Sequence, residues 1–169
     1  RRADPRLGHF TETSTDLSTD LKANPRVHHV ARWRLEKADA GAALSAPKQP
    51  IVFWLDKNIP AAYRQAVTDG VLEWNKAFEK IGFKSAIVVK QQPDDAEWDT
   101  LDARHASIRW FVGADVGFAR GPHHADPRTG EIIDADIAMS DVFGRGARRF
   151  IVEDLGPTAP PLLARSHAQ

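Results

Sequence analysis

Residues 51–89 read IVFWLDKNIPAAYRQAVTDGVLEWNKAFEKIGFKSAIVV, and this stretch decides the fold. Its first five residues form a continuous apolar run of strand length, which is typical of a strand covered on both faces. A proline opens the predicted helix, where its missing N–H costs no hydrogen bond. Apolar residues then recur at helical spacing, and Gly82 follows as a helix terminator. We therefore predict a strand at 51–55, one helix over 60–81 and a second strand at 86–89.

The pattern beyond this stretch extends the sheet. A strand–helix–strand unit of this spacing makes its two strands parallel. Residues 107–112 predict a third strand, and residues 117–122 predict a short irregular edge strand. After a turn at 126–130, residues 131–139 alternate between apolar and mainly polar side chains, which is typical of a half-buried strand. The residues alone therefore predict an α+β domain.

The N-terminal part of the chain is less regular. Residues 1–24 are polar and predict exposed strands or loops, and residues 38–50 are rich in Ala, Gly, Ser and Pro and predict a connector. Between them, charged residues alternate with apolar ones over 30–36. This period of two predicts a half-buried strand there.

Composition limits the classes of function. The 169 residues include 23 Lys plus Arg and 23 Asp plus Glu, so the formal net charge is zero. This balance argues against broad electrostatic capture of nucleic acid or of an anionic membrane surface. No apolar run reaches the roughly 20 residues that a transmembrane helix needs. The absence of cysteine excludes disulfides, thiolate metal sites and cysteine nucleophiles.

The histidines are the first candidates for chemistry. None of the seven is followed by Glu, so the zinc-binding helix motif H-E-x-x-H is absent. His123, His124 and Asp126 lie close together, and Asp134 and Asp136 follow just beyond the turn. Adjacent histidines in an extended chain point to opposite faces, so both rarely reach one ion. We therefore prefer two solvated imidazoles to a metal site.

The remaining clusters have equally plain interpretations. Asp134 and Asp136 share one face of a predicted strand and could act as paired carboxylates in acid–base chemistry. We prefer to interpret them as the polar face of an amphipathic strand. The acidic loop at 91–104 lacks the spacing of a calcium-binding EF-hand and is interpreted as a solvated loop. The sequence contains neither a nucleophile elbow nor a phosphate-binding glycine loop. The residues alone therefore reveal no active site.

Several segments resemble a bacterial family of large zinc-dependent metallopeptidase-like proteins with a metzincin-type catalytic domain. The long run Trp74 to Phe83 makes the resemblance fairly specific, and the matching segments together span about residues 3–140. The matching segments are Asp4 to Phe10, Arg32 to Lys37, Pro50 to Asp56, Gly70 to Phe83, Asp94-Asp95, Asp102 to Arg104, Ile108 to Trp110 and Asp126 to Ile132.

The resemblance implies a fold and a division of the chain. The fold is a mixed, largely parallel twisted sheet of four to five strands backed by one long helix, as in the N-terminal subdomain of zincins. Residues 1–49 are then an N-terminal strand/loop segment and connector, 50–143 the zincin-like upper subdomain, and 144–169 a flexible tail that leads to a missing catalytic helix. Gly117 to Arg120 falls where the family has its cleft-lining edge strand. The resemblance thus implies substrate binding by backbone pairing along Phe118, Ala119 and Arg120.

The implied function is that of one part of a zinc-dependent metalloendopeptidase, in a periplasmic or extracellular protein. Zinc is the expected cofactor of the full-length parent, where a zinc-bound water would attack the scissile carbonyl. The family's zinc ligands and catalytic Glu have no counterpart here, so we expect this chain alone to bind no zinc and to cleave nothing. The expected partners are a peptide or protein substrate, the remaining catalytic subdomain of the same chain, and a second copy if apolar surface is exposed.

Two other functions stay open. One is a catalytically dead module that captures peptides or surface polymers. The other is a purely structural domain of an envelope protein, which an edge strand blocked by the N-terminal segment would favour.

Overall fold

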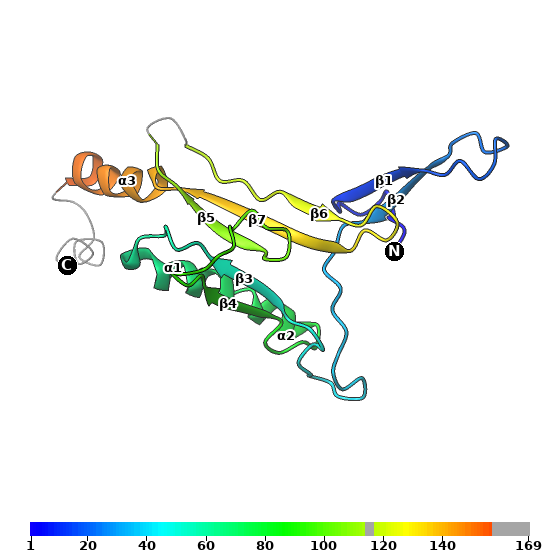
Figure 1. Cartoon of the computed structure of the whole chain (residues 1–169), viewed down its shortest axis with the longest axis horizontal. Coiled ribbons are helices and arrows are strands. Elements are labelled where there is room, and N and C mark those ends of the chain that lie inside the picture. The colour runs from blue at the N-terminus through cyan, green and yellow to red at the C-terminus, as the bar shows by residue number, and fades with distance from the viewer. Residues whose placement is uncertain (114–116, 157–169) are drawn as a thin grey trace.

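The computed structural model describes residues 1–113 and 117–156, which form a mixed five-stranded sheet, helices and a separate hairpin (Figure 1). The sheet has the order β4-β3-β5-β7-β6. Its first four strands in that order run parallel, and β6 is antiparallel to β7. The predicted α+β fold with a largely parallel sheet is confirmed. The strands are β3 (Ile51–Leu55), β4 (Ile87–Gln91), β5 (Ser107–Phe111), β6 (His123–Ala125) and β7 (Ile132–Ser140).

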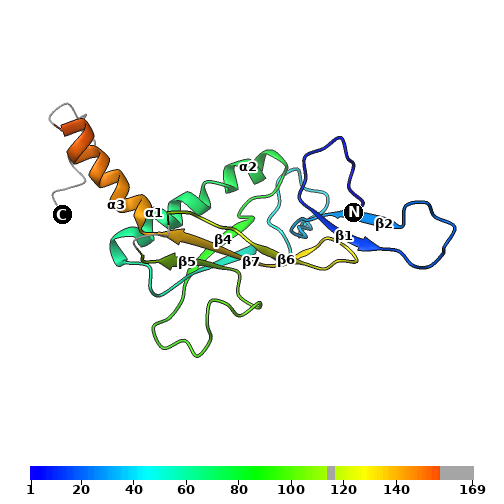
Figure 2. The same cartoon turned by 90° about the horizontal axis from the view of Figure 1, so that it is seen from above.

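Two helices, α1 (Ala61–Leu72) and α2 (Asn75–Lys80), lie along one face of the sheet (Figure 2). The prediction of one unbroken helix is wrong because the helical hydrogen-bond pattern changes after Leu72. There the N–H of Trp74 donates to Val71 O at 3.3 Å, a bond three residues back instead of four. The Asn75 side chain then pairs with the backbone of Ile87, at 2.9 and 3.0 Å, and fixes this turn against β4.

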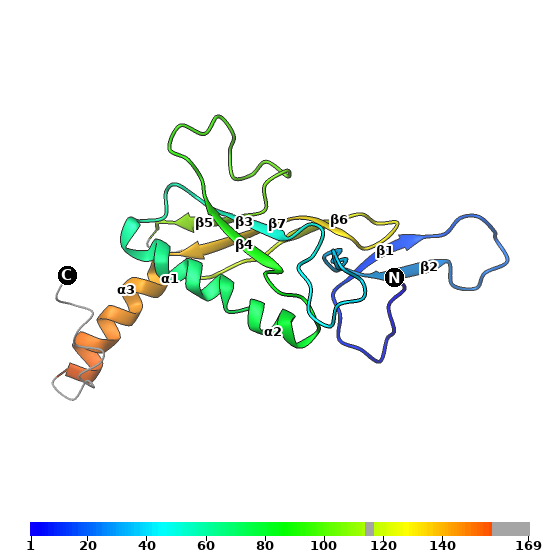
Figure 3. The same cartoon turned by 90° about the horizontal axis from the view of Figure 1, so that it is seen from below.

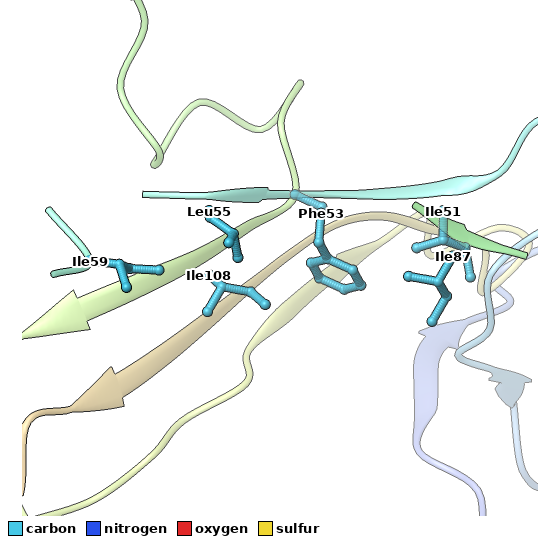
Figure 4. Close-up of a cluster of buried hydrophobic side chains, with 7 residues drawn as sticks. Ile51, Phe53, Leu55, Ile59, Ile87 and Ile108 are labelled. Carbon is cyan, nitrogen blue, oxygen red and sulfur yellow. The ribbon is translucent and has the colours of Figure 1, made fainter. Parts of the chain in front are cut away.

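The hydrophobic core lies where the sheet packs against Val67 and Val71 of α1 and Phe78 of α2. Figure 4 shows its buried side chains on the strands. Ile51, Phe53 and Leu55 of β3 point to this side and are buried, together with Ile108 of β5. Truncation of Phe53 to Ala would cost about 3–5 kcal/mol in stability. The other face of β3 is covered by the loop between β4 and β5, which projects away from α1 and α2 (Figure 3). Trp54 contacts Trp98 of that loop, with ring centroids 5.2 Å apart, so the apolar run is covered on both faces as predicted.

The N-terminal strands β1 (Thr11–Thr15) and β2 (Arg26–Val30) form an antiparallel hairpin separate from the main sheet. The predicted strand over 30–36 is wrong beyond Val30. Side-chain exposure does alternate over 31–36, but the backbone bonds to the main sheet only at Arg32. Its N–H donates to Gly130 O and its C=O accepts from Ile132 N, both at 2.9 Å. A single bridge holds this extended segment, so it forms no ladder.

Beyond β7 the chain forms α3 (Val142–Arg149) and a π-helical segment, η1 (Phe150–Leu155), in place of the expected flexible loop. Ion pairs one helical turn apart stabilise them: Arg145 with Asp141 at 2.9 Å and Arg149 with Glu153 at 2.6 Å. Arg148 also donates to the Tyr63 hydroxyl of α1. The remainder of the predicted tail, 157–169, lies outside the described residues. No helix in the described ranges has the length and apolarity to cross a lipid bilayer.

Candidate functional site

The predicted turn at 126–130 positions β6, the last strand in the order of the sheet. We call this side of the sheet the open border. Gly130 N donates to Asp126 O at 2.7 Å and closes the turn. Gly130 has φ 73°, and a Cβ atom there would lie 2.2 Å from Val30 O, so only glycine fits. The Arg128 side chain hydrogen-bonds the Asp126 carboxylate and holds the pKa of Asp126 below its usual range. The chain thus reverses sharply, and the segment before the turn lies against β7.

Residues 117–125, which we call the edge segment, pair with β7 over more than the three residues of β6. Arg120 exchanges both backbone hydrogen bonds with Ala138, at 3.0 and 2.7 Å. Asp136 N donates to Pro122 O at 3.1 Å. The register continues through β6, where His124 lies opposite Asp134. The edge segment therefore runs antiparallel along β7, with one isolated bridge at Arg120 and a ladder only over β6, so the strand predicted at 117–122 forms at 123–125 instead.

Alternation along this strand determines which backbone groups face away from the sheet. Because Arg120 and Pro122 turn their backbone groups toward β7, the groups of Ala119 and Gly121 point outward. Neither of these residues has a backbone hydrogen bond to another described residue. Their N–H and C=O groups are available to pair with an extended chain.

The predicted substrate-binding residues, Phe118, Ala119 and Arg120, differ in the direction of their backbone groups. Ala119 presents its backbone outward, whereas the backbone of Arg120 is already bonded to Ala138. Phe118 lies two residues before Arg120, so alternation directs its backbone groups to the same side as those of Arg120. Its side chain is 45% exposed. The backbone of Gly121 also faces outward, although the sequence does not predict this residue as part of the site. The sequence carries no signal for it, because the phase of an edge strand depends on its partner's register.

The N-terminal hairpin approaches the edge segment through side chains only. The Phe10 ring lies 6.3 Å from that of His123, and Glu12 Oε1 lies 3.7 Å from His123 Nε2. Within the described ranges, no backbone hydrogen bond joins residues 1–31 to residues 117–123. The blocked edge that would favour a purely structural domain is therefore not observed among these residues.

The two adjacent histidines point to opposite faces, as predicted. His123 turns toward Glu12, whereas His124 Nδ1 lies 3.5 Å from Asp134 Oδ2 on the other face. His124 is mostly exposed and Asp134 is buried. Over the described parts of the chain, no three His, Asp or Glu side chains are grouped so that they could hold a metal ion.

The carboxylates of β7 are not the solvated polar face that the alternation predicts. Asp134 is only 1% exposed, and its Oδ1 atom has no hydrogen-bond partner among the described residues. Burial, with the nearby Asp136 as a second cause, raises the pKa of Asp134 above its usual value. Asp136 accepts a 2.6 Å hydrogen bond from the Ser107 hydroxyl of β5. These contacts join neighbouring strands, so both carboxylates serve the sheet and not a solvent-facing acid–base pair.

Comparison of the chain with protein-family models, with curated proteins and with solved structures gives no match.

Proposed function

We propose that this chain is the upper subdomain of an exported zinc-dependent endopeptidase. We further propose that its edge segment holds the extended peptide substrate. The observation that carries the proposal is the antiparallel edge with outward backbone groups at Ala119 and Gly121. Pairing through main-chain groups binds many sequences, because every peptide has the same backbone. This tolerance suits an endopeptidase with varied substrates.

The distribution of apolar side chains supports the same proposal. Ile137 and Met139 of β7 point to the side of the sheet that carries the helices, and both are only half-buried. Trp110 of β5 is half-buried on that side and stacks on Tyr63 at 5.3 Å. Phe143 and Phe150, on the helical segment after β7, are about half exposed, at 51% and 52%. We propose that the remaining catalytic subdomain of the same chain covers these side chains.

The described residues do not fit a catalytic zinc ion. They include no group of three possible ligands, and the full sequence has no H-E-x-x-H motif. We therefore assign no step of zinc chemistry to any residue of this chain. Its proposed contribution is to align an extended peptide along the edge segment.

The peptide-binding part of the proposal is tested by removing one outward N–H. Ala119→Pro deletes the N–H of residue 119 and leaves the inward bonds of Arg120 in place. With a library of unstructured peptides of about ten residues, we expect it to weaken binding at least tenfold, measured by NMR titration. Ala119→Ser keeps the N–H and is the matched control, expected to bind as the unmodified chain does. Equal binding by the proline and serine variants would contradict backbone pairing at this residue.

The alternative function is a catalytically dead peptide- or polymer-binding module. A longer polypeptide from the same gene would distinguish it from the endopeptidase. A zinc ion and peptide-bond hydrolysis in that longer protein would support the endopeptidase. Peptide binding at the edge segment without zinc or hydrolysis would favour the binding module.

A further inference from the structure

The guanidinium of Arg109, on β5, forms an ion pair with Asp56 but no side-chain hydrogen bond to another described residue. The Arg109 side chain is 24% exposed, and its Nε atom is buried with no hydrogen-bond partner among the described residues. The Asp56 carboxylate lies 4.0 Å from Nε, which is beyond hydrogen-bond distance. Burying a guanidinium N–H without an acceptor, as at Nε, costs free energy. This arginine therefore requires an explanation.

Arg109 borders a cavity of about 300 Å³ on the face of the sheet away from α1 and α2. Asp56 and Gln92 directly follow β3 and β4 and line it, so the cavity lies at the carboxyl ends of parallel strands. Ligands of open sheets commonly bind at this end. Trp98 and Thr100, from the loop between β4 and β5, also line the cavity. Figure 3 shows this loop projecting from the sheet on the side away from α1 and α2.

Two buried polar side chains of the cavity, Asp56 and Gln92, are held in place by hydrogen bonds. Asp56 Oδ1 accepts hydrogen bonds from the backbone and side chain of Asn58, at 2.8 and 2.9 Å. Gln92 accepts from Lys57 N at 3.1 Å and donates to Trp98 O at 2.9 Å. The walls are thus fixed by their own bonds, and the guanidinium of Arg109 is the lining cation whose donors stay uncommitted among the described residues.

The charges of the lining indicate the ligand's chemistry. Arg109 and Lys57 are positive, whereas Asp56, Glu97 and Asp99 are negative. A planar guanidinium binds a carboxylate through two parallel hydrogen bonds. The surplus of acidic groups disfavours a doubly charged anion and favours an ammonium group on the same ligand.

We propose that this cavity binds a small zwitterion of the free amino acid type. Its carboxylate lies on the Arg109 fork, and its ammonium group is attracted by the carboxylates of Glu97 and Asp99. The site is independent of the edge segment, because β7 and β6 lie on the far side of β5 in the sheet.

The test compares glycine with two probes that lack its charge pattern, acetate and inorganic phosphate. In NMR titrations read at the Trp98 indole, we expect saturable binding of glycine, weaker binding of acetate and the weakest binding of phosphate. Arg109→Gln and Arg109→Lys should each weaken glycine binding at least tenfold, since lysine keeps the charge but loses the fork. Arg32→Gln, at an exposed arginine away from the cavity, is the matched control and should leave binding unchanged.

A second variant keeps the test valid if substitution of Arg109 impairs folding. Glu97 is exposed, so Glu97→Gln should fold normally. It should lower glycine affinity toward that of acetate, because only Asp99 then attracts the ammonium group, and it should not weaken acetate binding. No saturable glycine binding, phosphate or acetate binding as tightly as glycine, or full affinity in both Arg109 variants would each overturn the proposal.

Discussion

The two borders of the main sheet treat their backbone groups differently. At the β4 border, the Asn75 amide donates to Ile87 O and accepts from Ile87 N, so a side chain substitutes for a missing strand. At the opposite border, Ala119 and Gly121 turn backbone groups outward with no described partner. Unprotected edges invite pairing with other chains, and proteins usually protect them. Ile87 is thus capped within the protein, and our proposal assigns the outward groups of Ala119 and Gly121 to a ligand.

Of the changes expected at the two borders, the largest comes from the turn that brings the edge segment against β7. Gly130→Ala would place a Cβ atom 2.2 Å from Val30 O at a φ of 73°, so the backbone must move. We expect a loss of about 2 kcal/mol or more in the free energy of unfolding, measured by urea denaturation.

Gly70→Ala is the matched control for this change. Gly70 lies inside α1, and a Cβ atom there would meet no atom within 4 Å. Alanine should stabilise the helix by about 0.5–1 kcal/mol. Equal effects of the two substitutions would mean that the turn does not constrain the open border.

Asn75→Ala tests the β4 border of the sheet. This change leaves the N–H and C=O of Ile87 without their partner, and Ile87 is only 7% exposed. A buried polar group left unsatisfied costs about 1–3 kcal/mol, which is the loss of stability that we expect in urea denaturation. Gln65→Ala, at an exposed residue of α1, should change stability by less than about 0.5 kcal/mol. A neutral Asn75→Ala would remove the distinction between the borders.

A smaller, pH-dependent effect is expected at Asp134, which joins the edge segment to β7 through His124. Burial raises the pKa of Asp134 in the folded state, so the folded protein holds this proton more tightly than the unfolded chain does. Its charge therefore destabilises the fold above the folded-state pKa, and this cost disappears as the pH falls below the unfolded value. Asp134→Asn should gain stability relative to the unmodified protein at neutral pH and lose that gain in acid. A stability difference that does not vary with pH would contradict this account.

The sequence predicts the parallel strands of the sheet better than it predicts the contacts at the two borders. Apolar runs and spacing locate the parallel strands, since burial on two faces leaves a strong pattern at 51–55 and 86–89. The cap at Asn75 leaves no such pattern, because one amide meets a strand 12 residues further along. The burial of Asp134 is also unpredictable from alternation, which describes a strand's two faces but not what covers them. The open border is predicted only as a segment, and its register with β7 decides that Gly121 faces outward and Arg120 does not.

The claim that the open border holds an extended peptide is tested most directly by amide hydrogen exchange, followed residue by residue by NMR. The N–H of Arg120 already donates to Ala138 O and serves as the internal reference. Adding a peptide that binds should slow exchange at Ala119 and Gly121 and leave Arg120 nearly unchanged. Bound peptide with unprotected amides at both Ala119 and Gly121 would contradict the account.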